Sequence, residues 1–365
     1  IAETKTNYSF HDAIIDFNKK LKEKLLDVNS VYVFDFFKFV IQYGENNVFN
    51  FQNYLFGDIK ISLDYIPYLA NELVPYVISF LGLTKKCIVV DLDNTLWGGV
   101  IGEDGFDGIR LGPQPPGNAF IEFQKYLKAL SQRGILLAIN SKNNFDDAIQ
   151  VIREHPSMIL KESDFSCMKI NWNNKASNML EISEELNIGL DSFVFFDDDP
   201  VNRELIKETM PEITAPDLPH DPSFYSEVIQ SLHDFSTFQI TSEDTKRGQM
   251  YLEQKQRTKS QNSLSDISEF LKTLNLEIEI KKTNSFTIPR ISQLTLKTNQ
   301  FNLTTKRYQE DEIQKFSEDT NILINCVQIK DKFGDNGITG VFIVEKTNSD
   351  EWFLDTFLLS CRVMG

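Results

Sequence analysis

The sequence predicts an α/β protein with a parallel sheet at its centre, followed by a second, smaller α/β domain. Short apolar runs that end in polar residues occur at Cys87–Val90, 136–140 and 193–196, and helix-like stretches separate them. Such runs are typical of parallel strands that are covered on both faces. Closely spaced prolines near residues 211–222 then mark a linker, after which helical and strand-like patterns alternate.

These signals divide the 365 residues into three parts. We expect an N-terminal region at 1–82, a core domain at 83–225 and a C-terminal domain at 226–365. The N-terminal region is rich in aromatic residues and mixes helical with strand-like patterns, so a small α/β region without assigned chemistry is expected there.

The first strand of the core carries the strongest chemical signal. Asp91 and Asp93 follow Cys87–Val90 directly, at the strand end where open α/β sheets place their ligands. One carboxylate can attack phosphorus while the other handles a proton, and a divalent metal can hold the phosphate. An ordinary acidic turn would also contain these residue types.

Polar residues follow the later elements in the same way. Ser141 ends the strand at 136–141, after a helix expected at 119–132, and Lys175 opens a helix at 175–186. Asp197 and Asp198 follow the strand at 193–196. Adjacent carboxylates repel one another without a cation, which favours a metal site.

This ordered set resembles the four motifs of the haloacid dehalogenase (HAD) superfamily, most of whose members are magnesium-dependent phosphatases and phosphotransferases. The resemblance implies Mg²⁺ as cofactor, a Rossmannoid parallel sheet, and catalytic Asp91 and Asp93. It also implies phosphate binding by Asn94, Ser141 and Lys175, and metal binding by Asp91, the backbone carbonyl of Asp93, and one or both of Asp197 and Asp198.

Residues 97–105, Trp-Gly-Gly-Val-Ile-Gly-Glu-Asp-Gly, predict a small β-hairpin cap. A Pro-rich loop at 111–117 follows it, so no large cap domain is expected. An open HAD-like site of this kind implies a macromolecular substrate or a neighbouring domain that serves as a lid.

The C-terminal domain is expected to mix helices and strands in an acyltransferase-like arrangement. Helical patterns cover 243–261, 265–274 and 288–298, and strand patterns cover 277–280, Ile322–Asp331, 340–345 and 352–361.

Longer strings resemble the FkbH family of polyketide biosynthesis, from about residue 83 to the last residue. They are DLDNTLWGGVIGEDG, FFDDDPVNRE, NQFNLTTKRY, DKFGDNGITGV and LLSCRVMG. The resemblance implies a HAD-like phosphatase joined to a GNAT-like domain. Such proteins hold the glyceryl unit of 1,3-bisphosphoglycerate as a cysteine thioester and pass it to the phosphopantetheine thiol of an acyl carrier protein. The site would then be composite, with Asp91 and Asp93 handling phosphate beside the cysteine.

Cys361 is the cysteine that this resemblance selects, and Arg362 beside it can lower the pKa of its thiol. From the residues alone, a buried core cysteine is the alternative. Asp335 and Asn336 lie in a glycine-flanked stretch and are expected either to assist the thiolate or to form a hairpin turn. Asn299, Gln300 and Asn302 are expected to bind the glyceryl oxygens, although polar residues that end a helix would look similar.

Composition limits the possible partners. The net charge of −16 disfavours nucleic acid, and no apolar run approaches the ~20 residues of a membrane span. The 4 scattered cysteines favour a reducing cytoplasm. A basic stretch, Lys246, Arg247, Lys255, Arg257 and Lys259, is expected to dock an acidic carrier protein or simply to face solvent.

The first residue is Ile1, so the chain is expected to be a loading domain cut from a multidomain synthase. Two alternatives stay open: a plain phosphatase of a phosphoprotein or small phosphate ester, and an inactive scaffold that recruits a carrier protein.

Overall fold

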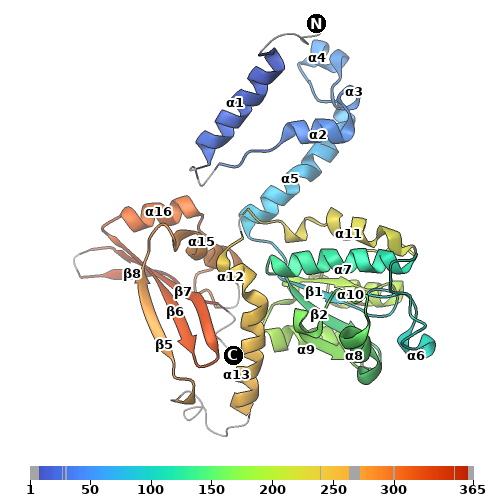
Figure 1. Cartoon of the computed structure of the whole chain (residues 1–365). Helices are drawn as coiled ribbons and strands as arrows, with labels where there is room; N and C mark the ends of the chain where they lie inside the picture. The colour runs from blue at the N-terminus through green and yellow to red at the C-terminus, as the bar shows by residue number, and fades with distance from the viewer. Residues whose placement is uncertain are drawn as a thin grey trace.

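The structure is a computed structural model that describes residues 8–26, 28, 31–238, 240–262, 272–298, 301–348 and 350–360. The chain folds into an N-terminal group of helices, a central parallel-sheet domain and a C-terminal antiparallel-sheet domain (Figure 1). Cys361, Arg362, Asn299 and Gln300, together with most of the helix expected at 265–274, lie outside the described residues.

The core domain contains four parallel strands in the order β3-β2-β1-β4. Their bounds are β1 Cys87–Val90, β2 Leu136–Ser141, β3 Phe165–Ile170 and β4 Phe193–Phe196. The predicted parallel α/β core is therefore confirmed. Strand β3 was not predicted, because Ser and Lys interrupt the apolar residues of its sequence Phe-Ser-Cys-Met-Lys-Ile. Cys167 is buried in this strand.

Helices cover both faces of this sheet (Figure 1). The side chains of β1 alternate between the faces: Ile88 and Val90 join one apolar cluster, and Cys87 and Val89 join the other. Both clusters consist of buried side chains, and this close packing fixes the strand ends that follow. On the first face lie α7 Gly117–Gln132, α8 Phe145–Glu154 and α11 Tyr225–Ser231, and on the second lie α9 Lys175–Leu186 and α10 Pro200–Thr209.

The segment after the first motif is short, as expected, but it is not a β-hairpin. Its chain turns into a one-turn helix, α6 Ile101–Asp104, because the carboxylate of Asp104 accepts a hydrogen bond from the Val100 amide at 2.8 Å. Gly99 has φ +96°, and a Cβ there would lie 2.4 Å from that carboxylate. Glycine is therefore required for the helical turn and not for a hairpin.

The C-terminal domain is a four-stranded antiparallel sheet in the order β5-β6-β7-β8. The mixed order of helices and strands agrees with the expectation, and the GNAT-like assignment stays a prediction. A long helix, α13, contacts both β3 of the core and β7 of this sheet. The bounds are α12 Ser242–Thr245, α13 Arg247–Asn262, β5 Glu277–Lys282, α15 Ile288–Lys297, α16 Glu310–Glu318, β6 Ile322–Asp331, β7 Gly334–Lys346 and β8 Trp352–Leu359.

The N-terminal region differs from the expected mixture of helix and strand. Its described residues form helices and one isolated bridge, between Phe49 and Ile61. The strand-like aromatic run at 31–37 leads into a helix because Asp35 caps it, accepting from the Lys38 amide at 3.0 Å. The helices are α1 Phe10–Leu25, α2 Phe36–Tyr43, α3 Glu45–Val48, α4 Phe51–Gly57 and α5 Ile66–Leu81.

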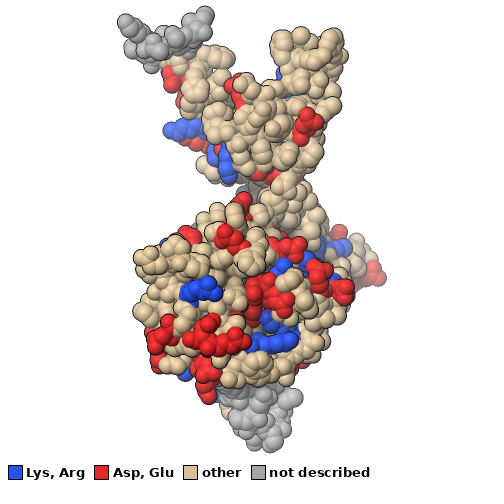
Figure 2. Space-filling view, turned by 90° about the vertical axis from the view of Figure 1, so that its right-hand side faces the viewer, with Lys and Arg blue, Asp and Glu red and all other residues tan. Residues whose placement is uncertain are grey.

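These N-terminal helices project from the rest of the molecule, and their visible surface carries few charges, whereas acidic and basic side chains crowd the body below (Figures 1 and 2). No helix within the described ranges combines the length and the apolar character needed to cross a bilayer.

Candidate active site

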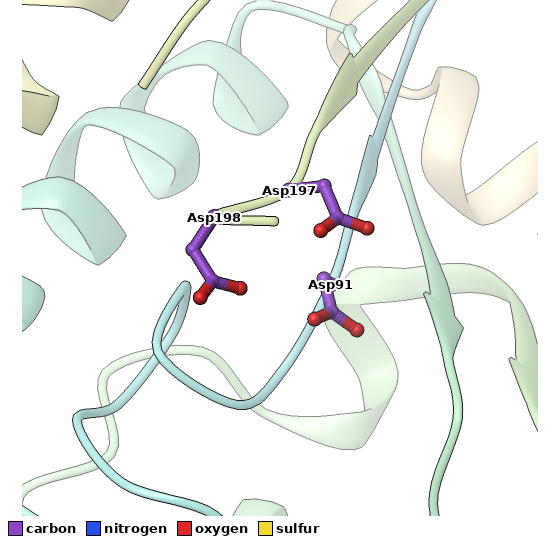
Figure 3. Close-up of side chains that lie close together, drawn as sticks. All are labelled: Asp91, Asp197 and Asp198. Atoms are coloured by element: carbon purple, nitrogen blue, oxygen red, sulfur yellow. The ribbon is translucent and has the colours of Figure 1, made fainter. Parts of the chain in front are cut away.

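Three carboxylates meet at the carboxyl end of the parallel sheet (Figure 3). Strands β1 and β4 are paired in register, Val90 with Phe196, so the residues that follow them emerge side by side. The amide of Asp91 donates to the Phe196 carbonyl at 2.9 Å and extends this pairing by one residue. As a result, Asp91, Asp197 and Asp198 each offer one oxygen within 4.8 Å of the others.

Lys175 supplies the positive charge in this cluster. Its buried ammonium lies 2.9 Å from Asp91 Oδ1 and 2.5 Å from Asp197 Oδ2. Asn174 caps the first turn of α9, and Asn140 donates to the Lys175 carbonyl at 2.9 Å, so the base of this side chain is fixed. Burial by itself lowers the pKa of Lys175, but the two carboxylates outweigh it and raise that pKa.

The charge balance of the cluster favours a bound cation. Burial and the neighbouring Asp91 raise the pKa of Asp197, and burial together with Asp91 and Asp197 raises the pKa of Asp198 to about 7. Among the described residues, buried Asp91 Oδ1 has no hydrogen-bond donor in good geometry, even though the ammonium is near. Oxygen ligands of this kind are those that Mg²⁺ prefers, so these residues fit a magnesium ion.

Asp93 lies outside this cluster and is held in place by three donors. Its Oδ1 accepts from Trp97 Nε1 at 2.9 Å and from the Ile101 amide at 3.1 Å, and its Oδ2 accepts from Asn143 Nδ2 at 3.0 Å. Burial raises the pKa of Asp93 despite these hydrogen bonds. The side chain is thus a rigid, partly buried carboxyl group suited to proton transfer.

The predicted phosphate-binding residues surround the same strand ends. Asn94 adopts a left-handed conformation with φ +53°, and its Oδ1 accepts from the Gly99 amide at 2.9 Å, so it also shapes the loop. Ser141 is buried at the end of β2, where its Oγ accepts from Asn143 Nδ2 at 3.1 Å. Asn143 therefore connects Ser141 to Asp93. The sequence analysis missed Asn143, although its place just after a strand is a usable signal.

Two further residues that the sequence analysis missed position the 197–199 turn. Arg203 is buried, and its Nη1 donates to the carbonyls of Asp197 and Asp198, both at 2.7 Å. Thr95 Oγ1 accepts from the Asp198 amide at 3.1 Å. Both contacts hold backbone groups of the turn, whereas the Asp197 carboxylate accepts from the Asp199 amide at 2.9 Å and from Asn202 Nδ2 at 3.3 Å.

The described residues predicted in the C-terminal domain have local structural roles. Asn302 Oδ1 accepts from the Thr305 amide at 3.0 Å and organises a turn. Asp335 accepts from Gln328 and from the Gly337 amide, and it lies in β7 and not in the expected turn. The turn occurs earlier because Asp331 pairs with Gly334. Asn336 is buried, and its Oδ1 has no hydrogen-bond partner among the described residues.

The end of the described chain lies far from the carboxylates. Ser360 lines a small cavity of about 80 Å³ together with Lys86 and Ser192, which precede β1 and β4. These residues mark the amino end of the parallel sheet, whereas Asp91 and Asp197 follow its carboxyl end. The length of β1 alone separates the two ends by about 13 Å. Cys361 itself lies outside the described residues, so the expected composite site stays a prediction.

Two arginines of the basic stretch that is expected to dock a carrier protein are paired with other residues of the fold. Arg247 donates to the Gly134 carbonyl at 2.8 Å and pairs with Asp244, and Arg257 pairs with Asp331. Arg257 is buried. Both arginines therefore join elements of the fold to one another, and a docking surface there would lack their charges.

Comparisons with known proteins bear on the core. No protein-family model and no curated protein sequence matches the chain. The solved N-terminal part of protein BF1531 from Bacteroides fragilis, which contains a phosphatase domain complexed with Mg, is 37% identical with a TM-score of 0.57. That match covers 63% of this chain and 61% of the other, so the chain spans about three fifths of that relative's length.

A second solved structure is 3-deoxy-D-manno-octulosonate 8-phosphate phosphatase from Moraxella catarrhalis, in complex with a magnesium ion, a phosphate ion and KDO. It is 18% identical with a TM-score of 0.27, and the match covers 44% of this chain and 94% of the other. The FkbH-like assignment stays a prediction. The Bacteroides fragilis structure contains a phosphatase domain, and its likeness supports the HAD-like core that the sequence predicts.

Proposed function

We propose that the core domain is a magnesium-dependent phosphatase whose reaction takes place at the carboxyl ends of β1 and β4. The observation that carries this proposal is the cluster of Asp91, Asp197 and Asp198, with oxygens within 4.8 Å of one another and one buried ammonium beside them. The Mg-complexed phosphatase domain to which the chain is similar supports the same activity.

The hydrogen bonds distinguish the roles of the two motif aspartates. All three donors to Asp93 hold its carboxyl group in place, whereas Asp91 Oδ1 has no hydrogen-bond donor in good geometry within the described part of the chain. Asp91 is therefore the group that attacks phosphorus, and an aspartyl-phosphate forms as the ester bond breaks. Asp93 gives its proton to the departing oxygen and takes one back from the water that then releases phosphate.

The other groups of the site stabilise charge. The Lys175 ammonium beside Asp91 balances part of the negative charge of the phosphoryl group. Bound Mg²⁺, held by Asp91, Asp197 and Asp198, would supply Lewis-acid stabilisation of the same charge. Ser141 and Asn94 lie at the same strand ends and offer hydrogen bonds to phosphate oxygens.

We further propose that the whole protein transfers a glyceryl unit from 1,3-bisphosphoglycerate, through a Cys361 thioester, to the phosphopantetheine arm of an acyl carrier protein. The FkbH-like strings that run from the core to the last residue support this extension. The similarity to a Mg-complexed phosphatase domain favours the plain phosphatase as a second candidate.

Mass spectrometry of the intact protein with Mg²⁺ and 1,3-bisphosphoglycerate tests both proposals. Asp91→Asn is expected to abolish phosphate release from the distal ester while a phosphoglyceryl adduct accumulates on the protein. Cys361→Ala is expected to remove every glyceryl adduct and to leave phosphate release from a simple ester unchanged. A glyceryl adduct that persists in Cys361→Ala refutes the thioester, and release of the distal ester phosphate that persists in Asp91→Asn refutes the phosphatase site.

A further inference from the structure

A cavity of about 530 Å³ opens beside the carboxylate cluster. Asp198 and Asn94 are among its lining residues, so it adjoins the position at which phosphate would bind. Pro116, Phe120 and Tyr225 supply apolar walls. The volume is in the range of pockets that hold a small organic molecule, and a phosphate group alone would fill only part of it. The cavity therefore has room for the remainder of a substrate.

One permanently charged cation lines this cavity. Arg110 is exposed, and its guanidinium makes no ion pair or hydrogen bond with any residue in the described part of the chain. The other ionisable lining groups are Asp198, His220, Asp221 and Tyr225. Asp198 belongs to the carboxylate cluster, and Asp221 Oδ1 accepts from the Ser223 amide at 2.9 Å. Arg110 is thus a cation without a partner, facing the space where a substrate would extend.

The backbone of Arg110 is fixed relative to the reacting groups. Its amide donates to the Gly98 carbonyl at 2.7 Å, and its carbonyl accepts from the Gly98 amide at 3.0 Å. A Cβ on Gly98 would lie 2.8 Å from a ring carbon of Phe120 and 3.2 Å from the Arg110 Cβ, so only glycine allows this close pairing. Trp97, the residue before Gly98, donates to the proton-transfer group Asp93. Arg110 is therefore connected to Asp93 through Gly98 and Trp97.

We propose that Arg110 binds a second anionic group of the substrate, so that the site selects phosphate esters that also carry a carboxylate or another phosphate. This inference rests on the proposed phosphatase function and gives its substrate class. A guanidinium binds either kind of anion through two parallel hydrogen bonds, and the apolar walls weaken competition from water. An ester with an uncharged remainder would leave Arg110 unpaired and would gain nothing from it.

Three esters with the same three-carbon skeleton provide the test: 3-phosphoglycerate, glycerol 1,3-bisphosphate and glycerol 3-phosphate. In Arg110→Gln, KM for the first two is expected to rise about 10- to 100-fold, while kcat/KM for glycerol 3-phosphate changes less than about twofold. A larger effect on 3-phosphoglycerate would identify carboxylate as the preferred second group, and a larger effect on glycerol 1,3-bisphosphate would identify phosphate. Arg153→Gln is the matched control, because Arg153 pairs with Glu162 on the surface and lines no part of the cavity.

Equal losses for all three esters in Arg110→Gln, or no loss for any, would overturn the proposal. Calorimetry on the full chain with Mg²⁺, in an Asp93→Asn background, measures binding without turnover. Arg110→Gln in this background is expected to weaken 3-phosphoglycerate binding by a similar factor and to spare glycerol 3-phosphate. If the unmodified protein released no phosphate from any ester, the phosphatase proposal would fail. Calorimetry would then decide the role of Arg110 separately: an unchanged ratio of the affinities for 3-phosphoglycerate and glycerol 3-phosphate in Arg110→Gln would refute it.

Discussion

The parallel and antiparallel sheets of this protein differ in where they place their polar residues. In the core, Asp91 and Asp197 leave neighbouring strands at the same edge and meet there. In the C-terminal sheet, Asp335 lies within β7 and accepts hydrogen bonds from nearby groups of β6 and β7. Parallel strands all end on one side, whereas antiparallel strands end on alternate sides. Only the first arrangement gathers motif residues from distant parts of the chain.

The comparison also separates the two proposed chemistries. The described core contains all three carboxylates of the cluster, together with Thr95 and Arg203, which hold the backbone of Asp197 and Asp198. The cysteine chemistry depends on Cys361, which lies outside the described residues, and Ser360 before it lies at the other end of the parallel sheet. Variants that affect one region and spare the other are therefore the sharpest tests.

The largest effect is expected from Lys175→Met. This change removes the ammonium beside Asp91 and Asp197, so the carboxylates repel one another and the phosphoryl charge loses a partner. Phosphate release should fall about 100- to 1,000-fold, as measured by steady-state kinetics with Mg²⁺. Lys169→Met is a matched control, because Lys169 pairs with Glu181 and Glu185 away from the cluster. Comparable losses in both variants would contradict the assigned role.

A smaller effect is expected from pH. The pKa of Asp198 is about 7 without metal, well above the ordinary value of 3.8, so a proton competes with Mg²⁺ for this carboxylate. The proton's stabilisation of the folded state is present at low pH and is lost as the pH rises through 7. Mg²⁺ should therefore bind about tenfold more weakly at pH 6 than at pH 8, with a correspondingly smaller rise in Tm.

Titration calorimetry at the two pH values measures this difference directly. Asp198→Asn removes the titrating group, so the affinity should fall and its dependence on pH between 6 and 8 should largely disappear. Equal Mg²⁺ affinities at pH 6 and pH 8 in the unchanged protein would show that Asp198 does not bind the metal.

Asn143→Ala tests a residue that only the structure identifies. Its amide donates to both Asp93 Oδ2 and Ser141 Oγ, so the change frees the proton-transfer group and leaves the metal cluster intact. We expect kcat to fall about fivefold with Mg²⁺ affinity unchanged. Asn144→Ala is the neighbouring control, since Asn144 contacts Asp147 and Trp172 instead. A loss of Mg²⁺ affinity in Asn143→Ala would place this residue in the metal site.

The sequence predicted best where one segment determines its own structure. Apolar runs revealed β1, β2 and β4, and the residues after them lie at the sheet edge as expected. Strand β3 was missed because its neighbours, and not its own pattern, bury it. Arg203 and Asn143 were missed because their roles depend on contacts across the fold. The hairpin at 97–105 was wrong because a single carboxylate, Asp104, turns the chain into a helix.

The smallest effect is expected in the C-terminal domain, from Asn302. Its side chain is buried and accepts from the Thr305 amide, so Asn302→Ala should lower the free energy of unfolding by about 1 kcal/mol, measured by denaturant titration. Phosphate release should not change, because the cluster belongs to the other sheet. Asn302→Asp keeps an acceptor for that amide and should keep most of the stability. If Asn302→Asp instead abolished carrier loading at unchanged stability, Asn302 would bind the glyceryl group, and the antiparallel domain would contain a site of its own.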